Sequence, residues 1–132
     1  MAIYTKVSKD ELVEFFSKYN LGKIESYHGI KEGIENTNYF IQTNKNKFIL
    51  TIYEKRVQEK DLPFFMSLMR NLHDNEFPSP EPIVNKNGSY ISEISLKKAA
   101  IISFLDGSSK KILSPDNCYQ VGIYTAKMHL IT

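Results

Sequence analysis

The sequence has one cysteine, no long hydrophobic run and no excess of charge of one sign. The single thiol, Cys118, excludes an internal disulfide and is typical of a protein from a reducing compartment. No apolar run approaches the ~18 residues of a membrane span, and no cationic and apolar leader opens the chain. We therefore expect a soluble, cytoplasmic protein that does not associate with a membrane.

Charge and histidine content narrow the function classes further. The 17 Lys and Arg residues nearly balance the 15 Asp and Glu residues, which gives a formal net charge of +2. A dedicated nucleic-acid-binding protein needs a clustered cationic face, so we expect no nucleic-acid partner. His28, His73 and His129 show neither metal-ligand spacing nor a partner Ser or Cys nucleophile. The sequence therefore predicts no metal site and no nucleophilic catalytic group.

The first predicted element is a helix that begins after Ser8. Ser8 and Glu11 match a capping box, and Gly22 lies where a left-handed residue would end the helix. At 132 residues and 42% hydrophobic content, the chain can bury a core against this helix. Its apolar stripe consists of Leu12, Phe15, Phe16 and Tyr19.

Three strands are predicted next, over residues 24–27, 38–43 and 48–53. A turn rich in Gly and Asn joins the first two across residues 29–36, and a hairpin at residues 44–46 joins the second and third. A second helix is then predicted over residues 60–73, with Pro63 near its start. We expect one side of it to carry Phe64, Phe65, Leu68, Met69 and Leu72.

The remaining elements are predicted from turn and cap signals. Residues 77–82 are rich in proline and predict an extended connector. Asn87-Gly88 predicts a hairpin between strands at 83–84 and 90–91, and residues 99–105 predict a short strand that is buried on both faces. After a polar join at 106–111, Ser114, Pro115 and Asp116 begin a last helix that runs to Leu130.

This order of elements, with these residues, resembles the aminoglycoside phosphotransferase and choline kinase-like superfamily, and within it the homoserine kinases. The likeness runs over essentially all 132 residues in order, and the joint match is more specific than any one segment. The segments that carry it are Gly29–Tyr39, Phe48–Arg56, Asp61–Phe65, Phe77–Ile83 and Met128–Leu130.

The resemblance implies an α+β fold. Its main part is a kinase-like N-terminal lobe, an antiparallel sheet of about five strands with flanking helices, over residues 1–105. A hinge or linker at 106–113 and the first helix of a truncated C-terminal lobe at 114–132 follow. The complete enzyme would use ATP with Mg²⁺.

The resemblance also implies two groups of nucleotide-binding residues. A loop over the ATP phosphates would contain Gly33, Glu35, Asn36, Thr37 and Asn38, and its backbone N–H groups would meet phosphate oxygens. The alternative is an ordinary β-turn, for which Gly and Asn are also the usual residues. The adenine pocket and hinge would contain Ile49, Thr51, Ser103, Phe104 and Leu105.

One implied position departs from the superfamily. Many relatives have Lys or Arg where this chain has Thr51. A threonine hydroxyl has no positive charge with which to neutralise the phosphates. Lys55 and Arg56 are candidates for that charge, or they are solvated charges at a strand end. The glutamate that usually pairs with the cation is not assigned, since Glu59 falls near the beginning of the second helix.

No catalytic residue and no metal ligand is assigned. In the resembled enzymes the catalytic Asp, its partner Asn and the metal-binding Asp come from a larger C-terminal lobe, and the sequence ends at Thr132 without matching them. We therefore expect no homoserine kinase activity from this chain alone. An alternative is a non-catalytic nucleotide- or protein-binding module, and another is an unrelated α+β domain.

The last helix is apolar on several sides. Tyr119, Ile123 and Leu130 lie on one stripe, while Val121 and Tyr124 lie on other faces. A helix of this kind is usually buried on more than one side. We expect it to fray, to self-associate, or to bind a separately encoded C-terminal kinase lobe.

Overall fold

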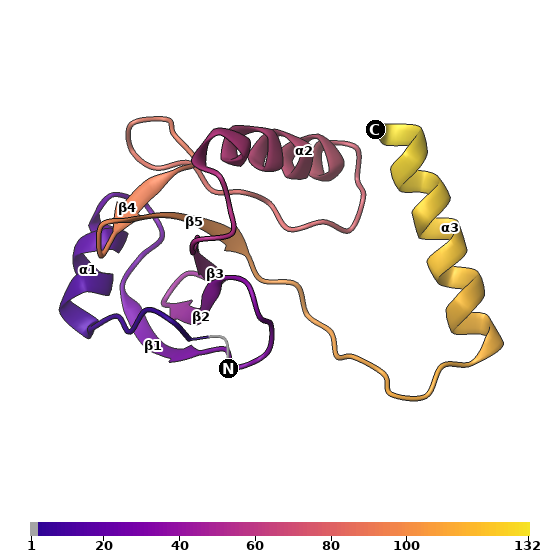
Figure 1. The fold of residues 1–132 in the computed structure, drawn as a ribbon, viewed down its shortest axis with the longest axis horizontal. Helices are drawn as coiled ribbons and strands as arrows, with labels where there is room; N and C mark the ends of the chain where they lie inside the picture. The colour runs from indigo at the N-terminus through magenta and orange to yellow at the C-terminus, as the bar shows by residue number, and fades with distance from the viewer. Residues whose placement is uncertain (1–2) are drawn as a thin grey trace.

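A computed structural model describes residues 3–132 of the chain. It contains a single antiparallel sheet of five strands in the order β1-β2-β3-β5-β4 (Figure 1). The elements in chain order are α1 (Lys9–Ser17), β1 (Ile24–Gly29), β2 (Thr37–Thr43), β3 (Lys47–Ile52), the 3₁₀ turn η1 (Glu59–Asp61), α2 (Leu62–Asp74), β4 (Ser92–Ile94), β5 (Lys97–Ser103) and α3 (Pro115–Ile131). The expected α+β class and five-stranded sheet are confirmed.

The main core lies between α1 and one face of the sheet. Strand residues alternate between the two faces, so every second residue of β2 and β3 is buried on the α1 side. Burying a large apolar side chain contributes about 1.5–3 kcal/mol, so this cluster is the main source of stability. It is built chiefly from Leu12, Phe15, Phe16, Tyr39, Ile41, Phe48, Leu50, Ile52, Ala99 and Ile101.

The beginning of α1 agrees with the predicted capping box. The Glu11 backbone N–H donates to Ser8 Oγ over 3.2 Å, and the Ser8 N–H donates to a Glu11 carboxylate oxygen over 2.8 Å. Both contacts satisfy N–H groups that have no partner inside the helix. The predicted apolar stripe of this helix is buried in the core.

The predicted stripe of α2 is wrong in its phase. Leu72 is buried as expected, but Phe64 and Phe65 are exposed, and the other buried residues are Leu62 and Met66. Leu62 and Met66 are four residues apart and share a helix face. Phe64 lies on the opposite side of the helix, and Phe65 lies at the edge of the buried face. The apolar content of this segment is high enough to fit two phases, and the helix adopts the one set by Leu62.

The predicted hairpin around Asn87-Gly88 is also wrong. A turn does form there, because Gly88 has φ 78° and its N–H donates to the Asn85 carbonyl over 3.0 Å, but no strands flank it. The hairpin lies further along, between β4 and β5, where Ser95 and Leu96 have φ of 51° and 61°. Two left-handed residues match a type I′ turn, which usually takes Asn or Gly.

The helix α3 begins at the predicted residue but packs on almost nothing. The side chain of Ser114 accepts a hydrogen bond from the Asn117 N–H over 3.1 Å, and Pro115 is the first helical residue. Residues 104–114 form neither helix nor strand, and they carry α3 away from the sheet (Figure 1). No residue of α3 is buried. None of the described helices is long and apolar enough to cross a membrane.

Candidate functional site

The sheet has an open face on the side away from α1. Strand pairing places Asn38 opposite Thr51 and Phe40 opposite Ile49, and it continues both rows onto β5. The two rows are Asn38-Thr51-Ala100 and Phe40-Ile49-Ile102. Apart from the buried Ala100, these side chains are half-buried. This face therefore combines an apolar row with a polar row.

The polar row contains a hydrogen bond between two of the predicted site residues. Thr51 Oγ1 donates to Asn38 Oδ1 over 2.8 Å. The structure therefore brings the predicted phosphate-loop residue Asn38 together with Thr51, for which the resemblance implies the position of a cation in related enzymes. Because the hydroxyl donates to the amide oxygen, the amide N–H₂ group of Asn38 is left to act as a donor.

Aromatic rings extend the apolar row. The Phe40 ring stacks with His28, with centroids 5.0 Å apart, and meets the Phe104 ring edge to face, with centroids 5.2 Å apart. Lys47 Nζ lies 5.9 Å from the centre of the Phe104 ring. Phe40 was not predicted as a site residue. The period of two places Phe40 on this face, but the predicted three-residue turn would have paired it with Leu50. The observed register, with Gln42 opposite Lys47, pairs it with Ile49.

The predicted phosphate loop closes on itself at its base. The Ile30 N–H donates to the Asn38 carbonyl over 2.9 Å, and Gly33 has φ 100°, a backbone conformation that favours glycine. Glu35 is exposed at the tip, whereas Asn36 Oδ1 accepts the Glu54 N–H over 3.2 Å. The loop is thus held at residues 36–38, and its tip is free of the sheet.

Thr37 lies on the opposite face from Asn38 and is fully buried. Its hydroxyl oxygen accepts the backbone N–H groups of Tyr4 and Thr5 over 3.0 and 3.2 Å, and it donates to Glu54 over 2.8 Å. The Thr37 side chain therefore anchors the loop from behind and does not point to the open face.

A carboxylate beside the loop was missed by the sequence analysis. Glu54 follows β3, and its carboxylate accepts hydrogen bonds from the hydroxyls of Thr5 and Thr37 and from Lys97 Nζ. Burial alone would raise the pKa of this carboxyl group, but the hydrogen bonds from Lys97, Thr5 and Thr37 outweigh that effect and lower the pKa below its ordinary value. Glu54 is therefore ionised near neutral pH.

The cationic candidates lie beside this cluster. Lys55 and Arg56 are exposed, and they line a hollow of about 480 Å³ next to the loop tip. Glu59 lies in η1, before α2, and the only acidic residue within α2 is Asp74, which pairs with Arg70 at 2.9 Å. So α2 provides no glutamate toward Thr51.

Two of the predicted hinge residues use their backbone N–H groups in hydrogen bonds within the protein. The Ser103 N–H donates to the Glu81 carbonyl over 2.9 Å, and its hydroxyl accepts the Glu81 N–H over 2.8 Å. The Phe104 N–H donates to the Lys47 carbonyl over 3.3 Å. Among the described residues, the backbone of Leu105 makes no hydrogen bond with another protein group. The free backbone groups of the predicted hinge, among the described residues, therefore include those of Leu105 and the Phe104 carbonyl.

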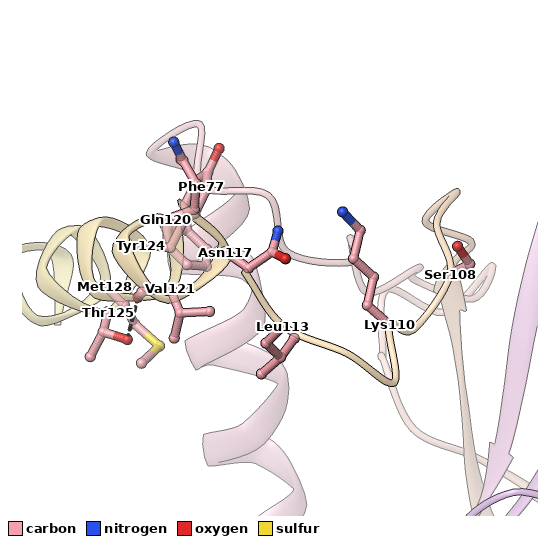
Figure 2. A pocket seen from close by; sticks show the side chains of 10 residues that line it. All are labelled: Phe77, Ser108, Lys110, Leu113, Asn117, Gln120, Val121, Tyr124, Thr125 and Met128. Atoms are coloured by element: carbon pink, nitrogen blue, oxygen red, sulfur yellow. Dashed lines mark hydrogen bonds between the residues drawn. The ribbon is translucent and has the colours of Figure 1, made fainter. Parts of the chain in front are cut away.

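A second hollow of about 460 Å³ lies between α3, the linker and the proline-rich connector. Figure 2 shows Val121, Tyr124 and Met128 of α3 on one side of it, with Phe77 close to Tyr124. The Phe77 and Tyr124 rings meet edge to face with centroids 6.0 Å apart. A hydrogen bond of 3.4 Å from the Asn71 side chain to the Ile131 carbonyl also joins α2 to α3. The apolar lining of this hollow is open to solvent.

Possible metal-ligating side chains are not clustered in the part of the chain that the structure describes. Within residues 3–132, no group of three or more His, Cys, Asp or Glu side chains is arranged to hold a metal ion.

Several curated proteins are similar to this chain in sequence. Homoserine kinases of Rhodopseudomonas palustris (strain TIE-1), Bradyrhizobium diazoefficiens and Agrobacterium fabrum are 48%, 46% and 44% identical to it over 130 residues. Each alignment covers 98% of this chain and 40% of the relative. The chain thus spans about two fifths of the length of these relatives and corresponds to their N-terminal part.

The fold and a family comparison agree with these relatives. The crystal structure of spectinomycin phosphotransferase APH(9)-Ia, in complex with ADP and spectinomycin, superposes with a TM-score of 0.74 at 14% identity, over 97% of this chain and 39% of that protein. At this identity the likeness concerns the fold, which is a kinase-like N-terminal lobe. The model of the phosphotransferase enzyme family matches residues 26–132. The chain belongs to this phosphotransferase family.

Proposed function

We propose that the chain is the nucleotide-covering lobe of a homoserine kinase-like phosphotransferase. The assembled enzyme would transfer the terminal phosphoryl group of ATP to the hydroxyl of homoserine, a step of threonine biosynthesis in the cytoplasm. The observation that carries the proposal is the open sheet face, where an apolar row and a polar row lie side by side below the loop at residues 30–36. The similarity to homoserine kinases supports this choice of substrate.

The two rows suggest how ATP would lie. The apolar row with Ile49 and Phe104 would contact the adenine ring, and the free backbone of Leu105 would pair with its polar edge. The polar row with Asn38 and Thr51 would lie beneath the phosphates. Backbone N–H groups around Gly33 would approach the phosphate oxygens from the loop.

This arrangement leaves the phosphate charge without a buried cation from the sheet. Thr51 donates only a hydroxyl, and Lys55 and Arg56 lie at the exposed hollow beside the loop. Mg²⁺ would supply the missing positive charge in such an enzyme. We propose that the groups that hold the ion come from the C-terminal lobe, as the resemblance to these kinases implies.

We also propose a catalytic kinase lobe as the partner of α3. Val121 and Leu130 expose 64% and 88% of their surface, and the hollow beside Tyr124 has an apolar lining. Covering these side chains would supply the burial that the helix lacks. The division into a lobe at 1–105, a linker at 106–113 and a helix at 114–132 follows from this assignment. Without the partner, we expect no phosphoryl transfer.

An ATP titration of the isotope-labelled chain followed by NMR tests the proposal. We expect shifts concentrated at the amides of Gly33, Ile49 and Leu105. The Ile49→Glu variant places a charge in the apolar row and should abolish these shifts. Val13→Glu on the exposed side of α1 is the matched control and should leave them unchanged. Shifts confined to other faces, or none at millimolar ATP, would refute nucleotide binding by this face.

A further inference from the structure

We infer that Glu54 is a positioning residue that, with Lys97 as its counter-ion, fixes the loop at residues 30–36 from behind. The inference rests on the proposed function only where it calls this loop a phosphate-binding loop. The contacts that carry it do not involve the open face of the sheet.

Three separate parts of the chain meet at the Glu54 carboxylate. Thr5 Oγ1 donates to it over 2.6 Å from the N-terminal segment, and Thr37 Oγ1 donates over 2.8 Å from the start of β2. Lys97 Nζ donates over 2.6 Å from the start of β5 and also reaches Thr5 Oγ1 over 2.7 Å. One side chain thus joins segments that are 17, 43 and 49 residues away.

The loop depends on the same cluster for its own contacts. Its last residue, Asn36, accepts the Glu54 N–H, and Thr37 at its exit donates to the Glu54 carboxylate. Its tip is held by the Tyr4 hydroxyl, which donates to the Ile34 carbonyl over 2.8 Å. The Tyr4 backbone N–H in turn donates to Thr37 Oγ1. These contacts therefore connect the loop to Glu54 directly or by way of its partner Thr37.

Burial of the Glu54 carboxylate favours a rigid arrangement of Glu54 and its hydrogen-bond donors. Only 9% of the Glu54 side chain is exposed, whereas 39% of Lys97 is exposed. A nearly buried carboxylate must keep its donors, because an unpaired buried charge is strongly unfavourable. The Thr5 and Thr37 hydroxyls are therefore held toward Glu54, and the backbone on both sides of the loop is held with them. A loop fixed before ligand binding loses less entropy when phosphate binds.

The test measures loop order in the full chain by ¹⁵N NMR relaxation. In the wild type we expect order parameters of about 0.8 for the amides of residues 31–36. Glu54→Gln removes the charge that holds Lys97 and should lower them to below about 0.6. Hydrogen exchange at the Thr5 and Glu54 amides should rise at least tenfold, while exchange at Ile41 and Leu50 in the core stays unchanged.

Two variants of Lys97 distinguish a positioning role of Glu54 from a general contribution to stability. Lys97→Met should loosen the loop as Glu54→Gln does. Lys97→Arg should leave the loop ordered, because it keeps the ion pair with Glu54. Glu93→Gln is the matched control, since it breaks the exposed Lys98–Glu93 pair in the same β4–β5 ladder. It should leave the loop order unchanged.

The outcomes are decisive in either direction. If loop order is unchanged in Glu54→Gln or Lys97→Met while the core exchange is preserved, the inference is refuted. Equal loosening by Glu93→Gln refutes it as well. Should Glu54→Gln fail to fold, the two Lys97 variants decide. If ATP does not bind the wild-type chain but these variants still loosen the loop, the proposed function fails and the positioning role of Glu54 stands.

Discussion

The helices α1 and α3 begin with the same kind of cap, but α1 packs against the sheet and α3 is not buried. Ser8 and Ser114 each form a capping box with the residue three positions later. The helix α1 buries Leu12, Phe15 and Phe16 against the sheet, whereas α3 is nearly twice as long and buries nothing. The comparison teaches that caps decide where a helix begins, and that tertiary packing decides how much it contributes to stability.

The arrangement of apolar residues explains the difference. In α1 they form one stripe that a single sheet face can cover. In α3 they are distributed around the axis, so that one surface could not cover them all. The helix α3 meets the rest of the chain mainly through the Phe77–Tyr124 pair. No residue of α3 is buried, so α3 is not part of the main core.

The largest expected effect is on the stability of the core relative to α3. Leu50→Ala removes a fully buried side chain from the core and should lower the free energy of unfolding by about 2–5 kcal/mol. Val121→Ala in α3 should change it by no more than ~0.5 kcal/mol. Urea denaturation followed by circular dichroism gives both values. An equally large loss in both variants would break the comparison.

The next effect concerns the ion pair between Glu54 and Lys97. Glu54→Gln should lower the unfolding free energy by about 1–3 kcal/mol at neutral pH, the typical loss for a hydrogen bond to a charged group. Because hydrogen bonds lower the pKa of Glu54 in the folded state below 4.5, this stabilisation is complete above pH 4.5 and is lost as the pH falls through the lower value.

Denaturation of both proteins at about pH 7 and about pH 3 checks this pH dependence. The difference between wild type and Glu54→Gln should be large at the higher pH and should shrink at the lower one. A difference that grows on acidification would contradict a lowered pKa for Glu54 in the folded protein.

A smaller gain is expected at the β4–β5 turn. Leu96 is completely exposed and has φ 61°, a conformation that costs a non-glycine residue about 1–2 kcal/mol. Leu96→Gly should therefore stabilise the sheet by about 1 kcal/mol, measured by thermal unfolding. Leu113→Gly is the control and should give no gain, because Leu113 does not have a positive φ. Destabilisation by Leu96→Gly would contradict the assigned turn.

The smallest change in stability is expected when the whole helix α3 is deleted. Removing residues 114–132 should alter the unfolding free energy of the sheet by no more than ~0.5 kcal/mol, because α3 contributes no buried residue. Hydrogen exchange at the Ile41 and Leu50 amides reports on the sheet alone. A marked acceleration there would mean that α3 supports the lobe.

Local sequence signals predicted most elements of the fold. The caps at Ser8 and Ser114 and the alternation across β2 and β3 are properties of a few neighbouring residues, and the structure agrees with them. The β4–β5 hairpin was missed because Ser95 and Leu96 are atypical of its turn, while Asn87-Gly88 had the typical residues without the flanking strands. Tertiary pairing overrode turn preference in both places.

The candidate site could be predicted only where it follows from strand order. Asn38, Ile49 and Thr51 lie on the open face because the strands alternate and pair in register. Glu54 could not be found in this way, since its partners at Thr5 and Lys97 become neighbours only when the chain is folded. The ligand roles of the loop and hinge residues stay predictions.

Reconstitution of a kinase tests the central claim most directly. The chain would be mixed with the purified portion of the Rhodopseudomonas palustris homoserine kinase that lies beyond the 130 aligned residues. We predict that ATP-dependent phosphorylation of homoserine requires both parts and that Ile49→Glu in this chain abolishes it. Phosphohomoserine formed by this chain alone, or a stable complex of the two parts without activity, would contradict the account.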